Sequence, residues 1–474
     1  MLMTLIQKEI MHHILSVRFV ALLLMCLLLI PLTFSISYRK YNQSLTDYQE
    51  SVNRARAEAK ENPPDAQHPN IEVSKLFLKP TPLSVFANGL EEVLPTHLGM
   101  TRNGIRTGSP ALAQAPLAYV LGNLDFLFIV GTVFSLLALL FTFDAVAGER
   151  EAGTLRINLS NSLPRDVFLW SKLIGGYIVF VVPFLVSFLL GLLILVGQGF
   201  PLGEFGVAAP VFGLMLISLL YIAVFFTMGV LISTCLDNAK TALIVAFTFW
   251  VLAVLIAPRG AFVIAKLVAP TRTQQTIYME KTALRNNLAK EKQGQLNKKI
   301  LEVFGTKLAI TPETEKTLNE IRKPINEEFR LKFQNQANKI DKDYQREKDR
   351  QEQMGEMLSR LVPTSSLIYS AINLTQTGKL KRDLYFQTGE RYYKQLDDSY
   401  FSEISDDAMA QVQQIMDRQM NNLSEAEEIP PPPSLTEPDL SETLRRSAVD
   451  VLLLGFFALA FTVVAFLKFF RSDI

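Results

Sequence analysis

The sequence has few of the residues on which most catalytic and metal sites are built. Its 474 residues include only two cysteines, four histidines and two tryptophans. Cys26 lies inside an apolar run and Cys235 lies beside another, so they cannot form the disulfide framework of a secreted domain. The chain also lacks a Gly-rich phosphate loop, a His-Glu-x-x-His zinc motif and a Gly-x-Ser-x-Gly elbow. The sequence therefore predicts neither an ATP site on this chain nor an enzyme.

An excess of charge of one sign is also missing. The 47 Lys and Arg side chains nearly balance 46 Asp and Glu side chains, which leaves a formal net charge of +1. No global field attracts nucleic acid to such a chain, so any electrostatic role has to be local. Hydrophobic residues make up 49% of the chain and charged residues 20%. This composition is too apolar for an ordinary soluble protein and predicts separate membrane-embedded and water-exposed parts.

Six apolar runs are long enough to cross a membrane as helices. A helix rises about 1.5 Å per residue and the hydrocarbon core is about 30 Å thick. We expect an all-α membrane protein with six transmembrane helices, an N-terminal interfacial helix and a mostly helical external domain. Glycines such as Gly175 and Gly229 are expected to let these helices approach closely. The predicted spans are residues 17–36, 118–143, 173–197, 211–233, 241–258 and 448–467.

Lys and Arg in the short polar segments set the expected orientation. The segment 144–172 carries Arg150, Arg156, Arg165 and Lys172. Short loops rich in Lys and Arg stay in the cytoplasm, so we expect this segment and both chain termini inside. The expected cytoplasmic segments are 144–172, 234–240 and the tail 468–474, and the expected external segments are 37–117, 198–210 and 259–447.

Residues 1–16 predict a helix that lies in the membrane plane. Its apolar residues share one helical face, and Glu9 and His12 lie on the polar side. A signal peptide is the alternative, but the length of the following apolar run and the amphipathic helix before it favour a retained anchor. His12 and His13 suggest a metal site or a pH switch. Because adjacent helix positions point about 100° apart and no further ligands accompany them, a polar interfacial face is favoured.

The long polar segment 259–447 contains two apolar stripes at helical spacing. One stripe ends near Phe304 and the other follows Pro312, so we expect a helical hairpin that rises from the membrane. Pro324 is expected to kink the second helix or to mark its true start. The prolines at 430–433 favour a rigid spacer over a recognition motif, because a recognition motif needs a cytoplasmic reader domain.

The segment 144–172 is a short polar island between two apolar runs. Its pattern is typical of a helix, a turn and a second helix, with Asn161, Ser162 and Pro164 as the break and Asp166 as the second helix's cap. One interpretation is an ordinary basic loop that only sets topology. The other is a short helix that passes movement to the adjoining spans. The residues that carry this second interpretation are Glu149, Gly153, Thr154, Leu155, Ser160, Pro164, Arg165 and Lys172.

These residues resemble the cytoplasmic loop of type-2 ABC transporter permeases, in which the segment docks into a separate ATPase subunit. The resemblance implies that Glu149 and Glu151 pair with basic groups of the ATPase or cap the short helix. It also implies that Arg165 and Lys172 hold the segment to lipid phosphate or to the partner. The expected ATPase-coupling residues are Glu149, Glu151, Gly153, Thr154, Leu155, Pro164, Arg165 and Lys172, with a secondary cytoplasmic contact at Asp237 and Lys240.

The resemblance also implies an assembly. Two permease chains, identical or different, would pair with two ABC ATPase chains in a bacterial inner membrane. ATP and Mg would bind the ATPase, so no cofactor, metal or nucleic acid is expected on this chain. Outward transport is the default of the family. The large insertion before the last span resembles permeases of gliding-motility and copper-maturation export systems.

Two functions of different classes remain open. The first is a permease for a hydrophobic or amphipathic substrate. The second is a subunit that transports nothing and passes ATPase movement through the external helical domain to a periplasmic or envelope partner. A membrane scaffold without an ATPase is a third, weaker possibility. Asn123, Asp125 and Tyr177 are possible pathway residues because polar groups are rare in these spans, although Asp125 is close enough to the outer interface simply to reach it.

Overall fold

The computed structural model describes residues 1–61, 71–102, 104–110, 124–160, 163–305, 312–401, 429–435 and 439–471. These residues form two compact units. Unit 1 comprises Met1–Leu255 and Val362–Ile474, and unit 2 comprises Ile256–Leu361. Asn123, Asn161 and Ser162, which the sequence singled out, lie outside the described residues.

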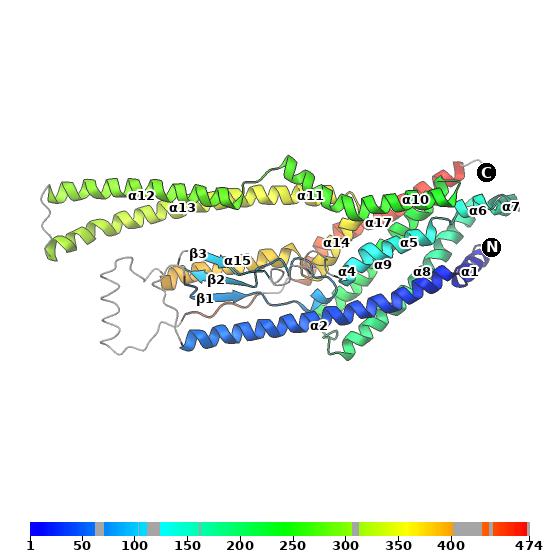
Figure 1. Ribbon diagram of the computed structural model, residues 1–474, viewed down its shortest axis with the longest axis horizontal. Helices are drawn as coiled ribbons and strands as arrows, with labels where there is room; N and C mark the ends of the chain where they lie inside the picture. Colours follow the sequence, from blue (N-terminus) through cyan, green and yellow to red (C-terminus); the bar gives the residue numbers. More distant parts are fainter. Residues whose placement is uncertain are drawn as a thin grey trace. The chain divides into compact units, whose positions relative to one another are not determined.

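Within the described residues, six helical stretches are long and apolar enough to cross a membrane (Figure 1). The predicted fold class is therefore confirmed as a mostly helical chain with six candidate spans. Four stretches belong to single helices: α2 (Val17–Glu61), α8 (Arg165–Gly197), α9 (Phe205–Cys235) and α17 (Leu440–Arg471). The stretch Phe126–Glu151 contains α4 (Phe126–Phe128), the π-helical η3 (Ile129–Phe134), α5 (Ser135–Thr142) and α6 (Ala147–Glu151). The stretch Ala239–Val268 contains α10 (Ala239–Trp250), the π-helical η4 (Val251–Ile256) and α11 (Ala257–Val268).

The N-terminal helix α1 (Leu2–Ile14) packs against α8 and buries Ile6 and Glu9. Gly175 of α8 permits the approach, because a Cβ atom at this position would lie 2.9 Å from the Cβ of Glu9. The sequence pattern assigned Glu9 to the polar side of an interfacial helix. That assignment is wrong, because Glu9 is 8% exposed and has a cation on α8 as its partner.

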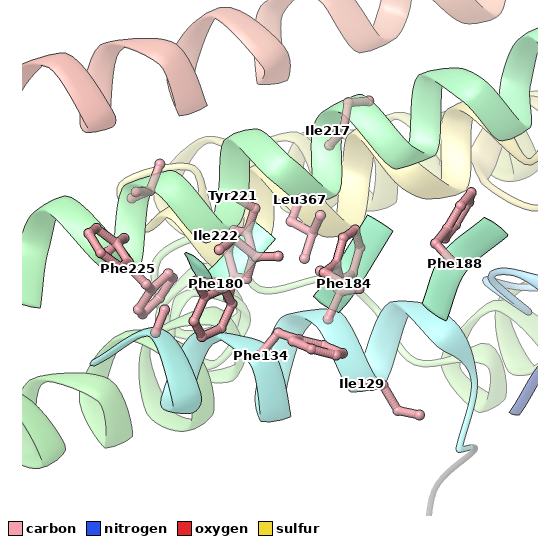
Figure 2. Packing of buried hydrophobic residues seen from close by; sticks show 14 of the residues in the cluster. Ile129, Phe134, Phe180, Phe184, Phe188, Ile217, Tyr221, Ile222, Phe225 and Leu367 are labelled. Carbon is pink, nitrogen blue, oxygen red and sulfur yellow. The ribbon is translucent and has the colours of Figure 1, made fainter. Parts of the chain in front are cut away.

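Phenylalanine rings fill the interior of unit 1. Figure 2 shows Phe134 of η3 beside Phe180 and Phe184 of α8, with Tyr221 of α9 nearby. The ring centroids of Phe134 and Phe184 are 5.2 Å apart at 84°. Such edge-to-face pairs contribute about 0.5–1.5 kcal/mol beyond the area that they bury. The spans described here are therefore held together by interlocked rings.

Gly229 of α9 sets how closely α5 can approach. A Cβ atom at this position would lie 1.9 Å from the Oγ1 of Thr142, which donates to the carbonyl of Ala138 at 2.8 Å. We expect Gly229→Ala to lower the free energy of unfolding by about 1–3 kcal/mol, because overpacking forces the helices apart. Thermal unfolding in detergent measures the effect. The control is Gly455→Ala on α17, where a Cβ would meet no atom within 4 Å, and equal stability of the two variants would contradict the close approach.

Helix α2 does not stop at residue 36, where the sequence pattern ends the first span. It continues as one helix to Glu61, because the polar stretch after Tyr38 contains no glycine or proline before that residue. The short helical turn η1 (Pro82–Val85) packs beside it. Phe86, directly after η1, contacts Phe34 of α2 at a centroid distance of 5.0 Å. The segment around η1 thus closes one end of the ring-filled interior.

A small antiparallel sheet is the main feature that the sequence pattern did not predict. It consists of β1 (Ser74–Phe77), β2 (His97–Thr101) and β3 (Gly104–Thr107) in the order β1-β2-β3. Ser74 pairs with Met100, and Leu98 pairs with Thr107. Strands of four or five residues are too short for their alternating pattern to stand out.

One face of the sheet packs on α15 (Lys379–Leu396). A Cβ at Gly389 would lie 2.5 Å from Leu98 Cδ1, so glycine lets the helix approach. The Tyr392 hydroxyl donates to the carbonyl of Pro430 at 2.7 Å, and burial raises the pKa of this tyrosine. The proline-rich segment is therefore attached to this layer at its first residue.

Unit 2 contains the two helices that the sequence predicted. Helices α12 (Gln274–Phe304) and α13 (Pro312–Ser359) lie side by side, and Leu288, Ile325 and Phe329 form the buried cluster between them (Figure 1). Pro324 lies inside α13 and does not mark its start. Two further elements follow in unit 1: α14 (Pro363–Leu374) and the π-helical η5 (Asp397–Phe401).

Candidate functional site

The segment 144–172 forms two short helices before α8 begins. Helix α6 ends at Glu151, and α7 (Thr154–Ser160) starts three residues later. Gly153 has φ +72°, a left-handed conformation that costs glycine little and that ends α6 before α7 begins. The sequence predicted one helix here, and Gly153 divides it in two.

A buried ion cluster joins three elements beneath this segment. The Nζ of Lys172, on the first turns of α8, lies 2.9 Å from Glu9 Oε1 of α1 and also pairs with Glu149 of α6. The Lys172 side chain is only 9% exposed. Asn158 of α7 donates to Glu149 Oε2 at 3.1 Å, so the second short helix is attached to the same cluster. Both carboxylates share one ammonium, and α1, α6, α7 and α8 are connected through it.

Helix α6 is also joined to the turn between α9 and α10. Arg150 Nη1 lies 2.6 Å from Asp237 Oδ1, and Glu151 Oε2 accepts from the backbone N–H of Ala239 at 3.0 Å. The buried hydroxyl of Ser233 accepts from the N–H groups of Val146 and Ala147, both at 3.0 Å. The segments 144–172 and 234–240, which the sequence treated as separate contacts, therefore form one bonded surface.

The start of α8 is joined to the last span. Arg165 Nη1 donates to the carbonyl of Phe470, in the last turn of α17, at 2.9 Å. A cation at that position also opposes the negative end of the helix dipole. Pro164 is the residue before the helix, and Asp166 lies in the first turn and makes no cap. The predicted capping role of Asp166 is wrong, because α8 begins at Arg165, two residues earlier than a cap at position 166 requires.

The outer face of α6 and α7 is open. Ala152, Thr154 and Arg156 are exposed, and Ile157 is 63% exposed, although Leu155 is buried. In the adjoining turn, Lys240 is also exposed, and Asn238 Oδ1 caps α10 by accepting from the Lys240 N–H at 2.8 Å. The open face thus presents one apolar side chain, Ile157, directly after the basic Arg156.

The other predicted site residues lie away from this surface. Asp125 is buried at the start of α4, where its oxygens accept from the N–H groups of Phe128 at 2.8 Å and Asn88 at 3.1 Å. The Tyr177 hydroxyl donates to the carbonyl of Leu219 at 2.8 Å. Asp125 is thus a buried helix cap. Nothing in these contacts tests a pathway role for either residue.

Sequence reasoning missed three contributors to the bonded surface: Glu9, Arg150 as the partner of Asp237, and Ser233. Only Glu9 carried a signal, since it follows the buried Ile6 by three residues on a helix. His13 lies 3.8 Å from Glu9 Oε2 and 4.7 Å from the Phe141 ring centroid, in a packed setting. Across the described ranges, no three His, Cys, Asp or Glu side chains are grouped to hold a metal ion.

Comparison with known proteins supplies the context for this surface. The model of the family described as ABC-2 family transporter protein matches residues 3–474. None of the curated proteins compared with the chain matches it. The family match covers α1, the segment 144–172 and α17 alike.

Proposed function

Since this chain belongs to the ABC-2 transporter family, we propose that it is the membrane subunit of an ATP-driven exporter, energised by an ATPase that docks on segments 144–172 and 234–240. Permeases of this family act with ABC ATPase partners and have no ATPase activity of their own. The observation that carries the proposal is the bonded surface, in which Glu149, Arg150 and Glu151 connect an exposed helix pair to α1, α8 and α10.

Movement of the docked ATPase passes through these bonds. A push on α7 reaches α6 through Asn158 and Glu149, and reaches α8 and α1 through Lys172. A push on α6 reaches the start of α10 through Arg150 and Glu151. The Lys172–Glu9 pair and the hydrogen bonds of Ser233 are buried and couple the spans to this segment, so we expect the spans to tilt together. The exposed Ile157 supplies the apolar contact that anchors the partner.

The proposed assembly is a dimer of permease chains with two ATPase chains in a bacterial inner membrane. Arg150, Arg156, Arg165 and Lys172 favour a cytoplasmic position for segment 144–172, and with it for both termini. Two large segments, 37–117 and 259–447, then lie outside. The size of the second is the feature shared with gliding-motility and copper-maturation export permeases.

A second function is favoured by one specific observation. The interior of the spans is filled by rings such as Phe134 and Phe184, and the external α13 has 48 residues, about 72 Å at 1.5 Å per residue. A closed interior and a long external helix suit a subunit that passes movement to an envelope partner without transport. The ATPase-docking surface is the same in both functions.

The test is purification of the assembly from native membranes in mild detergent, with partners identified by mass spectrometry. We expect an ABC ATPase to co-purify, and Ile157→Asp to reduce its recovery about tenfold, because a charge replaces the apolar contact. The matched control is Val93→Asp, at an exposed apolar position in the opposite part of unit 1.

Glu149→Gln separates docking from coupling. The amide keeps the shape of the side chain but weakens its pair with Lys172, so the ATPase should still co-purify while stimulated ATP turnover falls. Recovery of no ATPase under conditions that preserve the membrane assembly would refute the docking surface. Unchanged turnover in Glu149→Gln would refute the transmission through Lys172.

A further inference from the structure

A cavity of about 580 Å³ lies beyond the spans, between the C-terminal half of α2 and the layer formed by β1 and η1. Arg18, near the start of α2, pairs with Asp144 at 2.8 Å, so the cavity lies at the opposite end of the first span from the segment 144–172. A volume of this size is typical of a ligand site. We call it the α2–β1 groove.

One wall is a continuous face of α2. Tyr41, Ser44, Tyr48, Ser51 and Glu58 line the groove at steps of three, four or seven residues. These positions extend the face that is buried lower in the helix. Ser44 lies 18 residues, or about five turns, after the buried Cys26, and Tyr48 lies as far after the buried Ile30.

The face of α2 that packs against the rest of the protein is therefore apolar within the span and polar after it. In the span it carries apolar side chains that fill the contact, whereas along the groove it carries hydroxyl and ionisable groups. Polar side chains keep such a space open, because closing it would strip them of water. The groove is built into the sequence of the helix.

The opposite wall is the edge of the sheet on which β1 has no strand partner among the described residues, and we call it the free edge. β1 is the strand nearest to α2 in Figure 1, and it pairs with β2 on its other side. Leu78 N–H donates to the Thr96 carbonyl at 3.0 Å, which fixes the alternation of the ladder. Residues 74, 76 and 78 bond toward β2, so Lys75 and Phe77 direct their backbone N–H and C=O groups to the free edge.

Both signs of charge line the groove. Arg54 contributes a cation, and Asp47 and Glu58 contribute carboxylates. Two further cations of the lining are already paired, Lys40 with Glu92 and Lys75 with Glu72. Glu72, Lys75 and Arg106 surround His97 at the end of the groove, where burial lowers the pKa of its ring. With Tyr41, Tyr48 and Phe77, the lining is aromatic and of mixed charge.

We propose that the α2–β1 groove binds an extended polypeptide segment that carries side chains of both charge signs and that bonds through its backbone to the edge of β1. A free strand edge is the standard template for such binding. From Lys40 to Glu58 the α2 wall is about 27 Å long, which corresponds to about eight residues of extended chain. A neutral glycan is disfavoured, because it would cover Arg54 and Glu58 without pairing their charges.

The inference does not depend on ATPase docking, which concerns the other end of the spans. It is tested on the full-length protein in lipid nanodiscs by selecting a phage-displayed library of eight random residues. Clones are kept that bind the native protein and fail to bind Ser51→Trp, which fills the groove. The control is Asn53→Trp, at an exposed position of α2 outside the groove lining.

A selected sequence, made as a fluorescent peptide, is then measured by anisotropy. We expect Ser51→Trp to weaken binding at least about tenfold and Asn53→Trp to change it less than about twofold. Two further peptides carry N-methyl groups, one at the odd positions and one at the even positions. Only one of the two should lose binding, because only every second N–H bonds to β1. If Ser51→Trp does not fold, Arg54→Glu replaces it and should weaken peptides that contain acidic residues.

Three results would overturn the proposal. One is a selection that yields no clone sensitive to Ser51→Trp or Arg54→Glu. Another is a peptide that tolerates N-methylation at the odd and at the even positions alike, which would mean that the strand edge is not used. The third is displacement of the peptide by maltoheptaose, which would make the groove a glycan site.

Discussion

Lys172→Met is expected to lower the free energy of unfolding by about 3–5 kcal/mol. Lys172 is the shared cation of Glu9 and Glu149, and all three side chains are largely buried. Methionine keeps the length of the chain but leaves two carboxylates close together with no cation. Removing one partner from a buried ion pair carries this cost because the remaining charge is desolvated and uncompensated. Thermal unfolding of the detergent-solubilised protein measures the loss.

The matched control is Arg446→Met on α17. Arg446 pairs with Glu442 at 2.8 Å, one turn away, and both side chains are about half exposed. We expect this variant to lose less than about 1 kcal/mol, as is usual for surface pairs. Adding Glu9→Gln and Glu149→Gln to Lys172→Met should restore most of the lost stability, because the buried carboxylates are then neutral. Equal losses in Lys172→Met and Arg446→Met would show that the cluster is not desolvated.

Phe184→Ala is expected to cost about 3–5 kcal/mol, as for other buried phenylalanines. Phe184 is fully buried, and its ring lies 5.2 Å from that of Phe134 and 6.2 Å from that of Phe188 (Figure 2). Its neighbouring rings are bulky and are fixed by their own backbone, Phe134 on η3 and Phe188 one turn later on α8, so they cannot collapse into the space. Lipid does not replace the lost contacts, because the cavity is enclosed by protein.

The control for this variant is Phe212→Ala on α9, where the ring is 59% exposed in the protein and loses few protein contacts. We expect it to cost less than about 1 kcal/mol. Benzene added to Phe184→Ala should raise the unfolding temperature, since an enclosed apolar cavity binds such ligands. A Phe184→Ala protein that is as stable as Phe212→Ala would mean that the rings are loosely packed.

The spans and the paired helices of unit 2 were predictable because their signals are long. Hydropathy averaged over some 18 residues identifies a span whatever its neighbours are, and the stripes before Phe304 and after Pro312 persist over many helical turns. The sheet left no such signal. Its strands are short. Leu76 and Leu98 are buried only because α15, some 300 residues later in the chain, packs against them.

The sequence indicated which segment forms the candidate site, but not which ion pairs and hydrogen bonds hold it. Charge and turn residues mark the segment 144–172, and its position between two spans suggests a partner. The pairs Lys172 with Glu9, and Arg150 with Asp237, join residues far apart in the chain. The sequence alone does not show that the carboxylates of Glu9 and Asp237 are paired, because the local pattern carries no information about a cation that is distant in the chain. Roles toward the ATPase for Glu149 and Lys172 therefore remain predictions.

The length of α2 has a mechanical consequence. The helix contains Pro31 within the first span, where a proline removes one backbone hydrogen bond and allows bending. Glu58 lies 27 residues beyond it, about 40 Å along the axis. A bend of only about 10° at Pro31 would sweep Glu58 through about 7 Å, enough to open or shut the space beside β1. A small change of angle inside the bilayer is thus amplified into a large displacement far from it.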